Sequence, residues 1–208
     1  MPLNPNYATL AEGRTFLRIT DLGDTADDSL ISLGLGAASR AVDEATERQF
    51  GQQGSTVARY YTPRFSQAMG RWIADIDDLM TTTGLVVKAD LDDDDVYEHT
   101  YATADYRLWP YNAAGDGEPW TRIVFGPLAS TPPERPAAIE ATLNPGWSAV
   151  PDTVKLATLI QMGRFYKRRD APFGVAGSPD MGNQLRLLAK VDPDVAVMLE
   201  PYRRVDYV

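Results

Sequence analysis

Apolar side chains recur every three or four positions in the N-terminal quarter of the chain, which is the period of an α-helix that buries one face. The positions are Ile31, Leu35, Ala38, Val42 and Ala45. Asp27 and Asp28 suit the first turn of this helix, and Gly51 suits its end. Because the stripe is narrow and rich in small residues, we expect another helix to pack closely against it.

Two shorter helices are indicated by their capping residues. Thr9 and Glu12 have the spacing of a capping box, which predicts a short helix in the segment ATLAEGRTFLRI. Near the other end of the chain, Asp192 is a candidate cap and Pro193 occupies the first helical position of DPDVAVMLEPYRR.

A longer helix is predicted to begin after Pro151, which presets the first turn, and to run to Asp170. Apolar residues surround this helix almost completely, so its middle is expected to be the most buried element of the protein. They are Val154, Leu156, Ala157, Leu159, Ile160, Met162 and Phe165.

Between residues 56 and 143 the pattern changes to short segments rich in β-branched and aromatic residues, separated by Gly, Pro or Asp. These segments are typical of strands in an antiparallel lobe. They are TVARYYTP, RWIADI, GLVVKAD, VYEHTYAT, YRLWPY, TRIVFG and AAIEATL. Residues 126–137 contain four prolines and are expected to form a stiff loop.

The predicted fold class is therefore α+β, with about four helices and an inserted antiparallel β region in one structural domain. The N-terminal helices take residues 1–55 and the β-rich insertion takes residues 56–145. The C-terminal helices take residues 146–208.

The composition narrows the possible functions. The 29 acidic residues against 20 basic ones give a net charge of −9, which argues against a general nucleic-acid binder, since such proteins present a basic face. There are no cysteines, so disulfides, thiolate catalysis and Cys-ligated zinc are excluded. The N-terminus lacks the features of a signal peptide, and no apolar run approaches the roughly 18 residues of a membrane span, so we expect a cytoplasmic protein.

Candidate catalytic chemistry is sparse. His99 is the only histidine, and it lies in a predicted strand beside Glu98 with no G-x-S-x-G motif in the chain. The glycines at 34 and 36 lie inside the apolar helix stripe, where close helix packing explains them better than phosphate binding. We therefore expect no enzyme activity, no cofactor and no catalytic or metal-binding residues.

The acidic run DLDDDD at 90–95 matches a calcium loop only in part. Asp90, Asp92 and Asp94 occupy the first three ligand positions of an EF-hand, but Asp95 replaces the obligatory glycine and Tyr101 replaces the final glutamate. A solvated acidic turn between two strands is the favoured interpretation, with a weak divalent-ion site as the alternative.

A cluster of basic residues at the end of the long helix, Arg164, Lys167, Arg168 and Arg169, contrasts with the acidic background. These residues interact favourably with the helix dipole, typically by about 0.3–1 kcal/mol each when exposed. About four phosphate contacts would give only weak, salt-sensitive DNA binding. Arginines interleaved with Phe and Tyr are also the residue mix of protein interfaces. Spacing alone does not choose between the helix-dipole role and the interface.

The sequence resembles one known family, most specifically over residues 146–204. The run NPGWSAVPDTVKLATLIQMGRFYKRRDAPFGVAG followed by DPDVAVMLEPYRR is similar to the C-terminal half of head–tail connector (adaptor) proteins of tailed bacteriophages. In that family a Gly-Trp, a Val-Pro, a long apolar helix, a Tyr-Lys-Arg-Arg-Asp-x-Pro-x-Gly run and a closing Asp-Pro-Asp-Val…Pro-Tyr-Arg segment come in this order. The segments YATLAE, AASRAVDEATERQF, DYRLWPYNA and PWTRIVF also resemble family pieces, whereas Pro145 departs from the apolar residue expected before Gly-Trp.

The resemblance implies a helical bundle with an inserted β region, of which many copies, usually a dodecamer, form a ring. The ring lies in the neck of the virion below the portal protein, extends the DNA channel and provides the platform for stopper or tail proteins. Such a protein is made in the host bacterial cytoplasm, contacts no membrane and has no catalytic residues. Double-stranded DNA passes through without specific binding, since an acidic wall repels it.

The same resemblance implies which residues meet protein partners. The residues expected at the interface with the portal or an adjacent subunit are Arg164, Tyr166, Lys167, Arg168, Arg169, Asp170, Phe173, Tyr202, Arg203 and Arg204. We expect charge pairs there, and we expect the 171–184 segment and the end PYRRVDYV to order against the portal, so that the free protein is monomeric or weakly associated. The acidic turn is expected to face the channel or the outside; it comprises Asp92, Asp93, Asp94 and Asp95.

Three alternative functions remain open. A neighbouring head–tail stopper or tail-completion protein would also form a ring, although such proteins are usually β-barrel-like. A DNA-binding packaging protein would use the basic cluster, and its DNA binding would depend on salt. A calcium-dependent or carbohydrate-active virion enzyme would use the acidic turns, but it lacks a complete motif.

Overall fold

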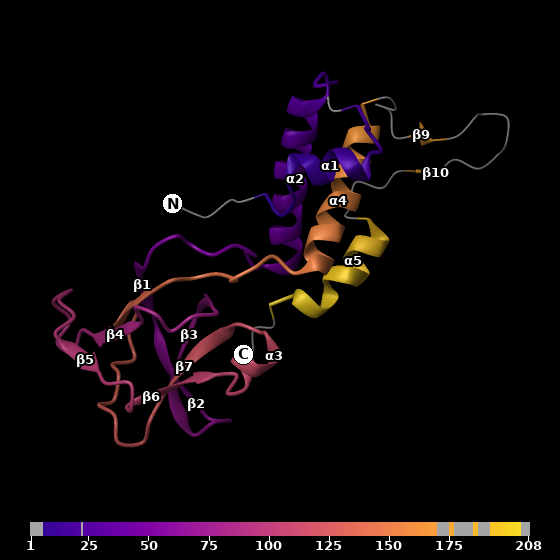
Figure 1. The fold of residues 1–208 in the computed structure, drawn as a ribbon. Coiled ribbons are helices and arrows are strands. Elements are labelled where there is room, and N and C mark those ends of the chain that lie inside the picture. The colour runs from indigo at the N-terminus through magenta and orange to yellow at the C-terminus, as the bar shows by residue number, and fades with distance from the viewer. Residues whose placement is uncertain (1–5, 22, 170–174, 177–184, 187–191, 205–208) are drawn as a thin grey trace. The chain divides into compact units, whose positions relative to one another are not determined.

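A computed structural model describes residues 6–21, 23–169, 175–176, 185–186 and 192–204. The chain divides into two compact units, one helical and one β-rich (Figure 1). The helical unit consists of residues 1–50 and 150–208, and the β-rich unit consists of residues 51–149. Residues 51–55 and 146–149, which the sequence pattern grouped with the helices, thus belong to the β-rich unit. The fold class is α+β with antiparallel sheets.

Helix α1 (Leu10–Phe16) begins with the predicted capping box, which is confirmed. The Thr9 hydroxyl oxygen accepts the amide N–H of Glu12, and the Glu12 carboxylate accepts the amide N–H of Thr9. The Thr9 amide, together with the Lys155 ammonium 2.9 Å away, lowers the pKa of Glu12 to about 2. A Cβ on Gly13 would lie 2.9 Å from a methyl group of Ile31, so α1 packs tightly on the next helix.

Helix α2 (Asp28–Thr46) buries the predicted stripe against the long C-terminal helix. Four of the five stripe residues are at most 1% exposed: Ile31, Leu35, Ala38 and Val42. Ala45 is half-buried, and Thr46 beside it is fully buried instead. A Cβ on Gly34 would lie 3.3 Å from Met162, which confirms the close approach of the two helices that the small residues predict.

The prediction that α2 ends just before Gly51 was wrong. The helix ends at Thr46 because Glu47 takes the left-handed conformation, with φ 55° and ψ 30°. Beyond this turn the chain inserts Phe50 into the core, where its ring meets that of Tyr7 edge-on at 5.7 Å. The Tyr7 hydroxyl accepts the amide N–H of Phe50 and donates to Asp43. Because these contacts and the burial of the Phe50 ring stabilise the turn, they outweigh continuation of the helix.

Helix α4 (Asp152–Lys167) is covered along its middle, where residues 157–165 are all buried or half-buried, although the apolar residues around it are not all buried. The buried residues are Val154, Ala157, Thr158, Gln161, Met162 and Gly163. Leu156 is 45% exposed, because α1, α2 and α5 (Pro193–Leu199) leave that face of α4 uncovered. Asp192 caps α5 by accepting the N–H of Asp194, as predicted, and a 3-10 helix, η2 (Glu200–Tyr202), follows.

The β-rich unit contains two four-stranded antiparallel sheets (Figure 1). In spatial order the first comprises β1 (Val57–Tyr61), β8 (Ile139–Leu143), β4 (Val86–Ala89) and β5 (His99–Tyr101). The second comprises β2 (Pro63–Ser66), β3 (Arg71–Leu79), β7 (Trp120–Phe125) and β6 (Tyr106–Trp109). Apolar residues of both sheets form a single core, so the sheets pack face to face.

Every strand predicted from the sequence is present, and two elements of this unit were not predicted. Strand β2 begins with a proline, which is tolerated because β2 lies at the edge of its sheet. The short helix α3 (Ala113–Asp116) ends at Gly117 in the left-handed conformation. A further pair of two-residue antiparallel strands, β9 (Val175–Ala176) and β10 (Leu185–Arg186), belongs to the helical unit.

Candidate protein-interaction site

The basic cluster at the end of α4 begins with Arg164, which connects this helix to α5. Its guanidinium lies 3.9 Å from the carboxylate of Asp192, and the Arg164 side chain is 12% exposed. The Gln161 side chain also accepts the amide N–H of Asp192, at 3.3 Å. Arg164 therefore helps to fix the start of α5, while its position in the last turn of α4 suits the helix dipole.

The last turn of α4 is also attached to the start of α2, through Asp27. One carboxylate oxygen of Asp27 lies 2.6 Å from the Arg169 guanidinium, and the other accepts the Tyr166 hydroxyl proton. The Arg169 guanidinium stacks over the Tyr166 ring, 4.9 Å from its centroid. The Tyr166 hydroxyl, and after it Arg169, hold the pKa of Asp27 below its usual value, and the hydrogen bond to Asp27 raises the pKa of Tyr166. We call these three residues the Asp27 contact.

The residues predicted at the C-terminal end of the interface contact the helical core in part. The Tyr202 ring meets Phe50 edge-on at 5.6 Å, and the amide N–H of Arg204 donates to the carbonyl of Thr46. Arg203 is exposed and lies 3.9 Å from Glu200. Lys167 is exposed and Arg168 is half-buried.

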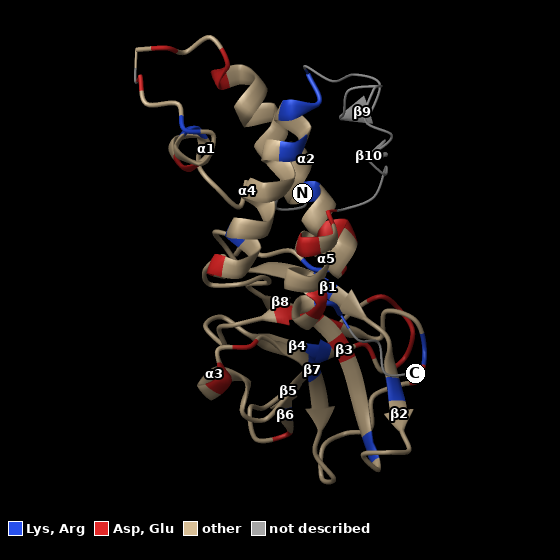
Figure 2. Ribbon diagram, turned by 90° about the vertical axis from the view of Figure 1, so that its right-hand side faces the viewer, with Lys and Arg blue, Asp and Glu red and all other residues tan. Residues whose placement is uncertain are grey.

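Two predicted interface residues, Asp170 and Phe173, lie outside the described residues, as do most of the 171–184 segment and residues 205–208. In Figure 2 the positively charged residues at the end of α4 contrast with the acidic residues spread over both units. The structure thus brings Tyr166 and Arg169 together, and it places Tyr202 and Arg204 at the other end of the helical unit's core, near the end of α2.

The acidic turn in the β-rich unit is organised around Asp90, which is only 3% exposed. Its carboxylate accepts the amide N–H groups of Asp92, Asp93 and Asp95. Asp93 and Asp95 have positive φ angles of 71° and 64°, which this short polar side chain tolerates. The turn is therefore built by hydrogen bonds from its own backbone to the first aspartate.

Arg135 partly neutralises this turn from the proline-rich loop. Its guanidinium lies 2.7 Å from Asp90 and 2.9 Å from Asp93, and it also donates to the Asp90 carbonyl. Burial acts to raise the pKa of Asp90, but Arg135 and the backbone N–H donors outweigh it and lower that pKa. This role of Arg135 was not predicted from the sequence, because the arginine lies 45 positions further along the chain.

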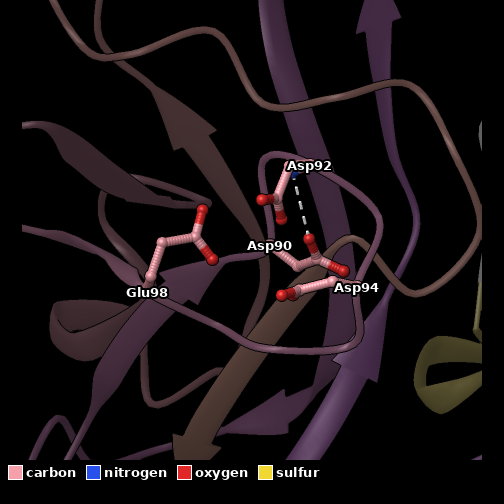
Figure 3. Close-up of side chains that lie close together, drawn as sticks. All are labelled: Asp90, Asp92, Asp94 and Glu98. Atoms are coloured by element: carbon pink, nitrogen blue, oxygen red, sulfur yellow. Dashed lines mark hydrogen bonds between the residues drawn. The ribbon is translucent and has the colours of Figure 1, made fainter.

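Asp90, Asp92, Asp94 and Glu98 present carboxylate oxygens within 4.8 Å of one another (Figure 3). Repulsion from Asp94 raises the pKa of Asp92. However, the Asp90 oxygens already accept hydrogen bonds from the turn and from Arg135.

His99, which the sequence placed in a strand, lies in β5 with its ring edge-on to Tyr101 at 4.7 Å, in a packing contact.

The Gly-Trp pair of the sequence lies where the chain leaves the β-rich unit. Gly146 has φ 112°, and a Cβ there would lie 1.8 Å from the carbonyl oxygen of Gly51, so only glycine fits. The amide N–H of Trp147 donates to the same Gly51 carbonyl, and the carbonyl of Pro145 accepts the N–H of Gln53. Pro145, the departure from the family pattern, thus fits the turn, because it supplies only an acceptor.

Asp78 at the end of β3 completes this arrangement. Its carboxylate accepts the indole N–H of Trp147 at 2.8 Å, and its backbone carbonyl accepts the N–H of Gly146. Both residues are buried, with exposures of 6% for Asp78 and 7% for Trp147. The contact holds the segments 51–53 and 145–147 side by side, close to where the chain enters and leaves the β-rich unit. We call this contact between Asp78 and Trp147 the Trp147 clamp.

Comparison with known proteins gives a structural match. No protein-family model matches the chain. No curated protein matches it by sequence. A chain in the solved structure "Neck of empty GTA particle computed with C6 symmetry" matches with a TM-score of 0.59 and 20% identity, over 100% of this chain and 95% of that one. A chain in "Neck of native GTA particle computed with C12 symmetry" matches with a TM-score of 0.52 and 19% identity, over the same shares.

These matches define the class of fold. The chain has the α+β fold of chains in the neck of GTA (gene transfer agent) particles, over its entire length. At about one residue in five identical, the likeness concerns the fold. Among the helices of the described residues, none combines the length and the apolar character that crossing a membrane requires.

Proposed function

We propose that this protein is a structural component of the neck of a phage-like particle, acting as a head–tail connector (adaptor) ring. The observation that carries the proposal is the match of both units, helical and β-rich, to neck chains over 95% of their length. The resemblance of residues 146–204 to the connector family supports the same function independently, because it comes from sequence alone. A structural role also fits the acidic turn and His99, whose side chains take part in hydrogen bonding and packing.

In this proposal many copies, twelve by analogy with the C12 neck, form a ring below the portal protein. The ring extends the DNA channel and provides the attachment platform for stopper or tail proteins in the virion. The net charge of −9 favours passage of DNA without specific binding. The Asp92–Asp95 turn is proposed to face the channel or the outside of the ring.

The charge pairs within the chain weigh against a DNA-binding function. Arg164 lies beside Asp192 and Arg169 pairs with Asp27, so these two cations of the cluster are balanced by carboxylates. A protein that gripped DNA through them would first have to break both pairs. Binding of DNA that weakens steeply with salt, with a slope near the number of basic contacts, would favour the packaging protein over the connector.

A neighbouring stopper or tail-completion protein is the closest alternative, since a neck contains several kinds of ring. The decisive experiment is electron microscopy of the purified protein mixed with the portal protein of the same particle. The proposal predicts a ring stacked directly on the portal. A protein that does not bind the portal alone but binds a preformed portal–connector complex would be a stopper. A protein that binds neither would contradict both the connector and the stopper assignments.

A further inference from the structure

Asp27 stands at the N-cap position of α2 but does not cap that helix. N-cap aspartates usually have extended backbone geometry and accept an N–H from the first turn. Asp27 instead has φ −98° and ψ 0°, and its side chain makes no capping hydrogen bond. Both of its carboxylate oxygens are bound to the end of α4, one to Arg169 and one to Tyr166.

The start of α2 is held separately from this contact. The Arg14 side chain of α1 lies 2.6 Å from the Asp28 carboxylate and also donates to the Asp24 carbonyl. The Arg14 side chain is 11% exposed, whereas the Arg169 side chain is 45% exposed. The Asp27 contact can therefore open at the surface while α1 and α2 stay joined through Arg14.

An open state is available to each partner. When Arg169 and Tyr166 leave, the Asp27 carboxylate can turn to the N–H groups in the first turn of α2, which is the usual role of an aspartate there. The released guanidinium and hydroxyl are donors that fit a carboxylate. In a ring of identical chains a neighbouring copy supplies such carboxylates in excess, because each chain carries 29 acidic residues against 20 basic ones.

We propose that the Asp27 contact is an autoinhibitory latch: it keeps Arg169 and Tyr166 from the carboxylates of a second copy until assembly begins. The identity of the partner rests on the proposed ring function, whereas the latch itself is a property of the single chain. The latch gives a physical reason for a free protein that is monomeric or weakly associated. It also links assembly to a change in the hydrogen-bond partners of the Asp27 carboxylate, from the end of α4 to the first turn of α2.

Amide hydrogen exchange, measured by NMR on the full chain, tests whether Asp27 is a latch or a cap. In Asp27→Ala the amides of Arg168 and Arg169 should exchange about tenfold faster, while those at the start of α2 keep their wild-type rates. In Asp27→Ser, which can cap but cannot hold Arg169, α4 should loosen equally and the start of α2 should become slower to exchange. Faster exchange at the start of α2 with no change in α4 would overturn the proposal.

Sedimentation velocity over a concentration series tests the inhibition. Asp27→Ala should self-associate at about tenfold lower concentration than wild type, and adding Arg169→Gln should reverse this gain. The matched control is Arg14→Gln, which removes the neighbouring ion pair of α2 and should not promote association. Equal association of wild type and Asp27→Ala would overturn the latch and leave the ring intact. No association by any variant, with or without portal protein, would overturn the ring and the latch together.

Discussion

The two units of the protein each hold a distant segment by an aspartate, and the two contacts differ in burial. In the Trp147 clamp of the β-rich unit, Asp78 and Trp147 are both less than a tenth exposed. In the Asp27 contact of the helical unit, the side chains of Asp27 and Arg169 are 33% and 45% exposed. A buried carboxylate left without its donor is costly, whereas an exposed ion pair contributes little to stability. The clamp is therefore suited to fixing a fold and the contact at Asp27 to changing partners.

The β-rich unit can be followed separately, which makes the comparison measurable. All four tryptophans, at positions 72, 109, 120 and 147, lie within residues 51–149. Tryptophan fluorescence during urea unfolding therefore reports on this unit, while the helical signal in circular dichroism is dominated by the helical unit.

The largest effect is expected for Gly146→Ala. The new Cβ would collide with the Gly51 carbonyl at 1.8 Å in a backbone conformation that disfavours side chains. We expect the free energy of unfolding of the β-rich unit to fall by about 3–5 kcal/mol. Gly115→Ala is the control, because a Cβ there would have no atom within 4 Å, and it should change stability by less than about 0.5 kcal/mol. A Gly146→Ala variant with nearly wild-type stability would show that the backbone around Gly51 and Gly146 can shift to accept a side chain.

Trp147→Phe should have the next largest effect. It keeps most of the buried ring but removes the indole N–H that Asp78 accepts at 2.8 Å. The expected loss is about 1–3 kcal/mol in urea unfolding, followed through the three remaining tryptophans. Asp78→Asn retains a carbonyl acceptor and should cost less than Trp147→Phe. The reverse order would mean that the site depends more on the carboxylate of Asp78 than on the indole N–H of Trp147.

The capping box of α1 makes the stability of the helical unit depend on pH, through the carboxylate of Glu12. Because the folded pKa of Glu12 is lowered to about 2 from 4.5, its contribution is fully present above pH 4.5 and is lost as the pH falls toward 2. Glu12→Gln should lower stability at pH 7 by about 0.5–1 kcal/mol and flatten the acid limb between pH 4.5 and 2. Circular dichroism at 222 nm during thermal unfolding measures this. An unchanged acid limb would show that the cap does not stabilise the helical unit.

The smallest effect on global stability is expected for Asp27→Ala. Its contact is exposed and its helix is held by Arg14, so the melting temperature of the helical unit should match that of wild type. A clear drop in melting temperature would place Asp27 with Asp78 as a structural residue and remove the contrast between the two contacts.

The sequence predicted what depends on neighbours along the chain. The capping box spans three positions and the buried stripe of α2 repeats every three or four, so both are visible in the pattern of residues. The contacts that organise the surfaces join Asp78 to Trp147 across 69 positions and Asp27 to Arg169 across 142. No local pattern pairs such residues. The end of α2 was predicted wrongly for the same reason, because that end depends on the contact between Phe50 and the distant Tyr7.

Native mass spectrometry of the protein mixed with its portal protein tests whether this chain forms a connector ring on a portal, as we propose. We expect a complex that contains twelve copies of the chain per portal ring, together with little association of the chain alone. A chain that remains monomeric in the presence of the portal would rule out a connector ring.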